Sequence, residues 1–309
     1  MTMKQWRLYF VYFALCVLSL SSVSAQEKNT VIISKAYKPI KVVINPGHGG
    51  TDPGKLRGTQ TLKHEKELNL EIALKLGKYI EERIKNVKVI YTRETDTFVS
   101  LDEIVDEANS NKADFFISIH CNSNPIRSVY GTRTHIQNHK FKASRKLAQM
   151  IEKEFATRAG RKSRGVMDRK DRGYNYQVLQ YTEMPGVLVE CGFITNPSEE
   201  KFLNSDYGQD LVASAIFRAF RDFVSEKPHI EKRKPYYKVQ ITAATQPENT
   251  GTSRYKKLGM RVDEVVDKKN GSYKYRYMVG REYEHRHAKQ LAKKVQDLGF
   301  KDAFVVKFE

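Results

Sequence analysis

Short, nearly continuous apolar runs separated by helical patterns are the feature that most constrains the fold of this 309-residue chain. Runs of this kind suit strands that are buried on both faces, as in a parallel or mixed sheet. The runs are Val42–Ile44, Val87–Tyr91, Phe115–Ile119 and Val187–Val189. Three stretches with apolar residues near every 3.6 positions predict helices around Leu68–Ile80, Leu147–Phe155 and Leu211–Phe220. The sequence therefore predicts an α/β fold, with a mixed, mostly parallel sheet flanked by helices.

Four polar side chains lie where these elements begin or end. His48 follows the first run within Asn-Pro-Gly-His-Gly-Gly, His120 closes the third run, and Glu190 closes the fourth. Glu65 begins the first helical pattern, on its core-facing stripe. Two imidazoles and a carboxylate are what a catalytic zinc ion takes when one position stays open for water. A further carboxylate nearby can act as general base, so the four residues predict a zinc hydrolase if the fold brings them together.

The two glutamates have structural explanations as well. An acid at a helix start is stabilised by the helix dipole, but an unpaired carboxylate facing the core is costly, and a bound cation would remove that cost at Glu65. Burial at the end of a strand should raise the pKa of Glu190 and favour a role in proton transfer. Asn122, two residues after His120, is predicted to orient substrate or a neighbouring ligand.

Six motifs occur in order along the chain: Asn45–Gly54, Glu65–Leu70, Thr92–Asp96, Ala108-Asn109, Ser118–Asn122 and Met184–Asn196. Together they resemble the zinc-dependent N-acetylmuramoyl-L-alanine amidases of the type 3 family, which cleave bacterial peptidoglycan. The resemblance spans residues 41–224, the predicted catalytic domain. It implies that His48, Glu65 and His120 bind Zn²⁺, that Glu190 is catalytic, and that the amide between N-acetylmuramic acid and L-alanine is cleaved.

Four positions depart from the family pattern. Ile104 stands where an arginine is frequent, and Arg133 stands where an acidic residue is common. Cys121 and Cys191 replace small or aliphatic residues. These two cysteines are predicted to be core residues, with a disulfide between them as the alternative. The segment between Asn124 and Tyr176 is too short for the additional helix that blocks the site in some members, so an open site is expected.

Residues 1–25 are predicted to be a signal peptide. Lys4 and Arg7 precede an apolar run of about 13 residues, which is shorter than the roughly 20 needed for a membrane span. Small residues then end at Ala25, where cleavage is expected; an uncleaved anchor is the alternative. The prediction is export to a periplasm, where cell-wall substrates lie.

The charge of the chain is +18, and removal of Lys4 and Arg7 leaves +16. An excess of this size suits an anionic partner, and an exported protein rarely meets nucleic acid. An anionic cell wall or membrane surface is therefore the expected partner, with a merely solvated surface as the alternative. Peptidoglycan is the predicted substrate, with its stem peptide at the catalytic site.

The charged, proline-containing stretch 225–235 is predicted to be a linker, and residues 236–309 a small α+β unit of ferredoxin-like shape. We expect strands at Tyr237–Ile241, Tyr273–Gly280 and Ala303–Val306, and helices at Arg254–Val266 and His285–Leu298. The unit carries 16 basic and 9 acidic residues.

Short motifs in this unit resemble the SPOR family of peptidoglycan-binding modules, which implies glycan binding and septal localisation. A basic module with another partner is the alternative. For the whole chain, a zinc peptidase or deacetylase on another cell-wall bond and a non-catalytic wall-binding protein are the competing functions. A regulatory protein is not identified by the sequence.

Overall fold

The computed structural model describes residues 39–57, 62–226, 235–266 and 274–308. The predicted signal peptide and most of the predicted linker lie outside these ranges. Among the described helices, none combines the length and the apolar character that a membrane crossing requires.

The first sheet has six strands in the order β2-β1-β3-β6-β4-β5. Neighbouring strands are parallel except for β4 and β6, so the predicted mixed, mostly parallel sheet is confirmed. The four predicted strand positions are confirmed, while β4 and β5 were not predicted because their polar sequences contain no apolar run. The strands are β1 (Ile40–Pro46), β2 (Val87–Tyr91), β3 (Phe115–Asn122), β4 (Thr132–His135), β5 (Ser163–Met167) and β6 (Gly186–Phe193).

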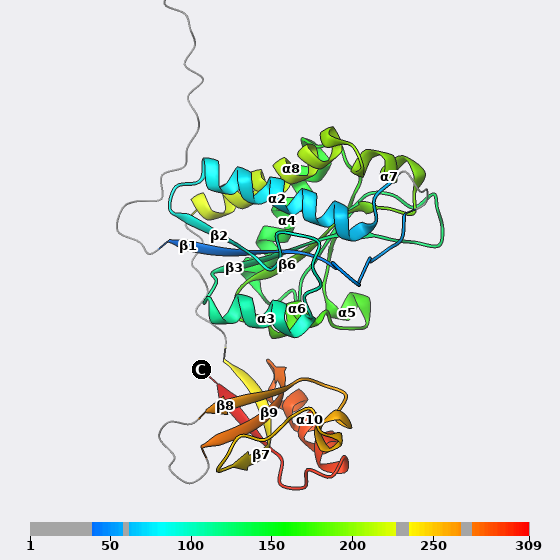
Figure 1. Cartoon of the computed structure of the whole chain (residues 1–309). Coiled ribbons are helices and arrows are strands. Elements are labelled where there is room, and N and C mark those ends of the chain that lie inside the picture. Colours follow the sequence, from blue (N-terminus) through cyan, green and yellow to red (C-terminus); the bar gives the residue numbers. More distant parts are fainter. Residues whose placement is uncertain (1–38, 58–61, 227–234, 267–273, 309) are drawn as a thin grey trace, which may run out of the picture.

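Helices cover both faces of this sheet (Figure 1). The larger core lies between the sheet and α2, α4 and α8, whereas α3 and α6 pack on the opposite face. The three predicted helices are confirmed; α3 was not predicted, although Ser100 and Glu103 form a capping box at its start. The helices are α2 (Glu65–Arg83), α3 (Leu101–Ser110), α4 (Lys142–Thr157), α5 (Arg169–Arg172), α6 (Gln177–Tyr181), α7 (Pro197–Leu203) and α8 (Asp206–Ser225).

The larger core is built around aromatic contacts between β3 and α8. The ring of Phe115 makes edge-to-face contacts with Phe220 and Phe223, at centroid distances of 5.6 and 5.5 Å. Cys121 and Cys191 are free and buried in the same core, which confirms their prediction as core residues. Since side chains alternate along a strand, burial of Cys121 and Cys191 turns the preceding His120 and Glu190 toward the opposite face.

A second, four-stranded antiparallel sheet has the order β10-β7-β9-β8. The helix expected over Arg254–Val266 is wrong beyond its first turn. Gly259, with a φ of +60°, follows the end of α9, and the β-branched run after it forms β8 instead. The elements are β7 (Tyr236–Ala244), α9 (Ser253–Lys256), β8 (Val262–Val266), β9 (Tyr275–Glu282), α10 (His285–Asp297) and β10 (Phe304–Phe308).

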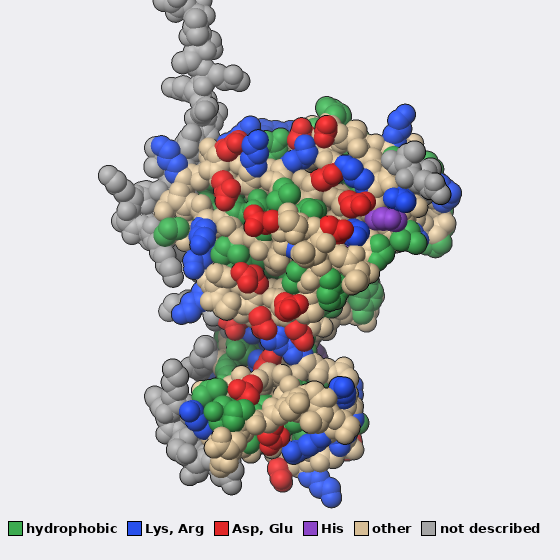
Figure 2. Space-filling view, in the orientation of Figure 1, with side chains coloured by type: hydrophobic (Ala, Val, Ile, Leu, Met, Phe, Trp, Pro, Cys, Tyr) green, Lys and Arg blue, Asp and Glu red, His purple; other side chains and the backbone are tan. Residues whose placement is uncertain are grey.

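The second sheet lies beside α3 and α6 of the first unit, and polar contacts join the two parts (Figure 1). Figure 2 shows acidic and basic side chains gathered where they meet. Arg261 donates to the backbone carbonyl of Asp102 at 3.1 Å and pairs with the carboxylate of Asp106. Arg281 pairs with Glu183 at 3.3 Å. These five residues define what we call the seam.

Candidate metal centre

The loop after β1 brings His48 to the carboxyl end of β3. The amide of Gly47 donates to the carbonyl of Ile119 at 2.9 Å, which fixes the loop beside His120. His48 adopts a positive φ of 63°, which is uncommon for a residue with a side chain and turns the ring toward the site. Glu65 reaches the same place from the first turn of α2.

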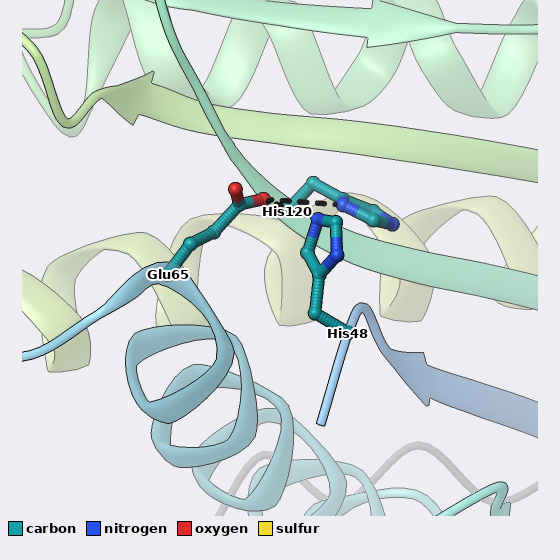
Figure 3. Close-up of side chains that lie close together, drawn as sticks. All are labelled: His48, Glu65 and His120. Carbon is teal, nitrogen blue, oxygen red and sulfur yellow. Dashed lines mark hydrogen bonds and ion pairs between the residues drawn. The ribbon is translucent and has the colours of Figure 1, made fainter. Parts of the chain in front are cut away.

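The structure brings His48, Glu65 and His120 together, and their side chains point toward one another (Figure 3). One carboxylate oxygen of Glu65, Oε1, lies 3.2 Å from Nε2 of His48 and 3.3 Å from Nδ1 of His120. The two rings meet edge to face at a centroid distance of 5.1 Å. One ligating atom from each residue lies within 4.8 Å of the others, a spacing that one metal ion can bridge.

Glu65 is buried and heavily hydrogen-bonded. It is 5% exposed, and Oε1 accepts from the amide of Cys121 at 3.1 Å while Oε2 accepts from the amide of Lys55 at 2.8 Å. Burial opposes ionisation, but the hydrogen bonds and charges of His120 and His48 outweigh it and hold the pKa of this carboxyl far below its usual value. The site therefore contains a fixed negative charge.

Asp52 orients the ring of His48. Its carboxylate lies 2.7 Å from Nδ1, which leaves Nε2 facing Glu65. Burial opposes protonation of His48, yet the interactions with Glu65 and then with Asp52 raise the pKa of the imidazole to about 9. A bound cation would take the place of this proton, and a carboxylate behind a ligating histidine is a frequent arrangement in metal sites.

Glu190 stands next to His120 in the sheet, because the two residues are register partners in the parallel pair β3–β6. Its side chain is buried, and Oε2 has no hydrogen-bond partner among the described residues. Burial and then the charge of Glu65 raise the pKa of Glu190 to about 8, although His48 opposes the shift. The predicted burial and raised pKa are thus confirmed, and an orphaned buried carboxyl faces the donor set.

A buried arginine holds the loop that carries His48. Arg93 is 4% exposed and donates to the carbonyls of Pro46 and Gly47, both at 3.0 Å, and of Lys66 at 2.8 Å. The motif that contains Arg93 contributed to the family resemblance, but its role as a clamp was not predicted. No local pattern reveals which carbonyls a distant arginine will reach.

Other side chains near the site were only partly predicted. Asn122 lines a cavity together with Arg133 and His135; its amide oxygen accepts from the amide of Ser123, so a role toward substrate stays a prediction. The imidazoles of His48 and His120 are 26% and 18% exposed, so solvent reaches them. Asp52, four residues after His48, and His135 were missed, because their contacts depend on the loop geometry and on β4.

The sequence matches the Amidase_3 family, described as N-acetylmuramoyl-L-alanine amidase, over residues 42–222. The chain belongs to this family. The match ends before the second sheet begins, so it concerns the six-stranded unit that carries the donor set.

Relatives and solved structures agree with this assignment. The chain is 35% identical over 197 residues to N-acetylmuramoyl-L-alanine amidase LytC of Bacillus subtilis, and the match covers 63% of this chain and 36% of LytC. An N-acetylmuramoyl-L-alanine amidase from Clostridium difficile 630 superposes with a TM-score of 0.58 at 33% identity, over 62% of this chain and all of that one. The catalytic domain of CwlV, an N-acetylmuramoyl-L-alanine amidase from Bacillus (Paenibacillus) polymyxa var. colistinus, superposes with a TM-score of 0.54 at 34% identity, over 60% of this chain and 98% of that one.

Proposed function

We propose that this amidase is a zinc-dependent, exported enzyme that hydrolyses the amide between N-acetylmuramic acid and L-alanine in peptidoglycan. The observation that carries the proposal is the donor set of His48, Glu65 and His120, with the orphaned carboxyl of Glu190 beside it. Membership of the amidase family supports the choice of bond.

The donor chemistry fits zinc. Two imidazole nitrogens and one carboxylate oxygen form a common catalytic set for zinc, and three protein ligands leave a position open for substrate. A buried carboxylate whose pKa is held low needs a cationic partner, as Glu65 does here. A zinc ion bound by these residues would supply Lewis-acid activation of the scissile carbonyl and of water.

Glu190 is the proposed general base. The pKa of about 8 describes its environment without added positive charge, and positive charge at the three ligands would lower this pKa toward neutrality. The carboxylate would then accept a proton from the attacking water and return it to the leaving amine of L-alanine. Burial of Glu190 keeps bulk water from competing for that proton.

We also propose that residues 236–309 form a ferredoxin-like, SPOR-like domain that binds glycan strands. The element succession β7-α9-β8-β9-α10-β10 supports this proposal. Binding of the polymer there would raise the local concentration of substrate at the metal centre. Residues 225–235 are the proposed linker, and residues 1–25 the proposed signal peptide for export to the periplasm. The SPOR-like domain is the proposed determinant of septal localisation.

The test uses the chain from residue 26 to residue 309 and purified sacculi. We expect one zinc per chain, release of stem peptides with a free L-alanine amine, and loss of release after chelation. Glu190→Gln should keep the zinc and lose the activity. Mass spectrometry that finds another bond opened would favour a peptidase or deacetylase, and wall binding without zinc or release would favour a binding protein.

A further inference from the structure

A cavity of about 420 Å³ opens beside the metal centre, and arginines dominate its polar lining. Arg133 enters it from β4, Arg164 from β5 and Arg172 from the end of α5. Asn122, two residues after the proposed ligand His120, lies on the same wall. Asn122 thus connects the cavity to the strand that carries His120.

The strand register connects this cavity to the proposed base. Glu190 pairs with His120 of β3 on one side and lies opposite Arg133 of β4 on the other. Residues directly opposite on neighbouring strands project from the same face, so the three side chains form one row across the sheet. A substrate whose amide lies between His120 and Glu190 thus has Arg133 as its next neighbour.

The guanidinium groups are held in place by neutral acceptors. Arg133 donates to the carbonyl of Arg164 at 3.2 Å and contacts Sδ of Met167 at 3.5 Å. Arg172 donates to the carbonyls of Ile136 and Met167. These bonds orient the planar groups without neutralising their charge.

Among the described residues, the positive charges of these three arginines are not neutralised by direct ion pairs. Within the described ranges, no carboxylate oxygen lies within ion-pair distance of Arg133, Arg164 or Arg172, and Nε of both Arg133 and Arg172 is buried without a partner. Asp171 also lines the cavity, but its carboxylate accepts from the amide of Asp168 and lies 3.4 Å from His139.

His135 also lines the cavity, and the nearby arginines affect its pKa. His135 is 4% exposed, and its Nδ1 lies 3.2 Å from Nη1 of Arg172. Burial and then the charges of Arg172 and Arg133 lower the pKa of His135 to about 3. The ring is therefore neutral, with Nδ1 as the acceptor and the proton on Nε2.

We propose that Arg133, Arg164 and Arg172 form a subsite for a free carboxylate of the stem peptide. The inference rests on the proposed function, because it takes the substrate to be a peptide attached to N-acetylmuramic acid. A planar guanidinium matches a carboxylate with two parallel hydrogen bonds, and a carboxamide presents only one acceptor oxygen and no charge. The subsite thus distinguishes acidic stem peptides from amidated ones.

Beyond L-alanine, a stem peptide with an acidic third residue offers two such carboxylates, one on its second residue and one on the side chain of its third. The test compares kcat/KM for four N-acetylmuramoyl tripeptides, all with the C-terminal carboxyl blocked as an amide: both of these carboxyls free, each one amidated singly, and both amidated. We expect amidation of the recognised carboxyl to lower kcat/KM about 10- to 100-fold, the range of a hydrogen-bonded charge. The single amidations identify which residue occupies the subsite.

Arg133→Gln and, independently, Arg164→Gln should remove this preference. Both variants should lose activity on the free acid and keep it on the doubly amidated substrate, whereas Arg145→Gln, an exposed change on α4, should behave as wild type. Equal rates on all four substrates for the wild-type enzyme would overturn the subsite while leaving the amidase function intact. The same holds if both arginine variants keep the wild-type preference.

Failure of the proposed function gives a different result. Zinc-loaded wild-type protein that hydrolyses none of the four substrates would contradict the amidase proposal. Calorimetric titration of Glu190→Gln with the free-acid and the doubly amidated tripeptides then measures the subsite without catalysis. Tighter binding of the acid, lost in the Glu190→Gln/Arg133→Gln double variant, supports the subsite, and equal binding overturns it.

Discussion

Gly47→Ala tests whether the loop after β1 and the ring of His120 are packed as tightly as the structure indicates. A Cβ at position 47 would lie 2.1 Å from Cε1 and 2.4 Å from Nε2 of His120. Carbon atoms in contact are about 3.5–4.0 Å apart, so the ring must move by roughly 1.5 Å. The loop cannot yield easily, because Arg93 holds the carbonyls of Pro46 and Gly47.

The displaced ring can no longer share a cation with Glu65 and His48 in the same geometry. A misplacement of about 1 Å can lower a catalytic rate about 10²-fold, and we expect at least that loss with weakened zinc retention. Overpacking should also lower the free energy of unfolding by about 1–3 kcal/mol. The assays are metal content after dialysis, release of L-alanine-terminated peptides and denaturant unfolding.

Gly186→Ala is the matched control, since Gly186 is also a buried glycine in the first unit. A Cβ there would approach Leu179 and Phe116 no closer than 3.5 Å, an ordinary contact distance. This variant should keep zinc and activity. A Gly47→Ala variant with wild-type zinc content and rate would refute the packing argument, because the added Cβ would then fit beside His120 without displacing its ring.

Three further predictions concern the base, the acid stability and the core. Glu190→Gln should lower the rate by about 10²–10⁴-fold with zinc retained, measured on the same peptides; an unchanged rate contradicts its role. Because the pKa of His135 is lowered from 6.5 to about 3, folding disfavours its protonation, so stability is full above pH 6.5 and falls as the pH drops toward 3. Relative to His135→Gln, wild type should therefore lose about 2 kcal/mol between pH 7 and pH 5 in denaturant unfolding, and parallel curves would contradict this. Phe220→Ala should lower the free energy of unfolding by about 3–5 kcal/mol, because it removes a fully buried ring that contacts Phe115 and leaves a cavity. A loss below about 1 kcal/mol would show that the cavity collapses.

Sequence patterns predicted the parts of the fold that apolar burial dictates. The four apolar runs became strands because both faces of a central strand need apolar cover, and Glu65 was noticed because a carboxylate on a core-facing stripe requires compensation. The helix expected over Arg254–Val266 failed because one left-handed glycine, Gly259, outweighs weak helical periodicity.

The less predictable parts depend on tertiary pairing. β4 has the sequence Thr-Arg-Thr-His, whose polar character gives no strand signal, and only its antiparallel register against β6 places Arg133 opposite Glu190. Asp52 and Arg93 act through contacts to a loop whose path is set by a positive φ at His48. Such contacts follow from the folded geometry rather than from periodicity.

The seam has a consequence for how the two parts of the molecule move. It contains Arg261 with Asp102 and Asp106, whose carboxylate side chains are more than half exposed, and exposed pairs contribute only about 0.2–1 kcal/mol each. Mobile ions screen such pairs over about 8 Å at physiological salt. The pair between Arg281 and Glu183 is different, because its side chains are only 3% and 19% exposed and are screened far less. Rising ionic strength should therefore weaken the contacts of Arg261 first and leave the seam held at Arg281.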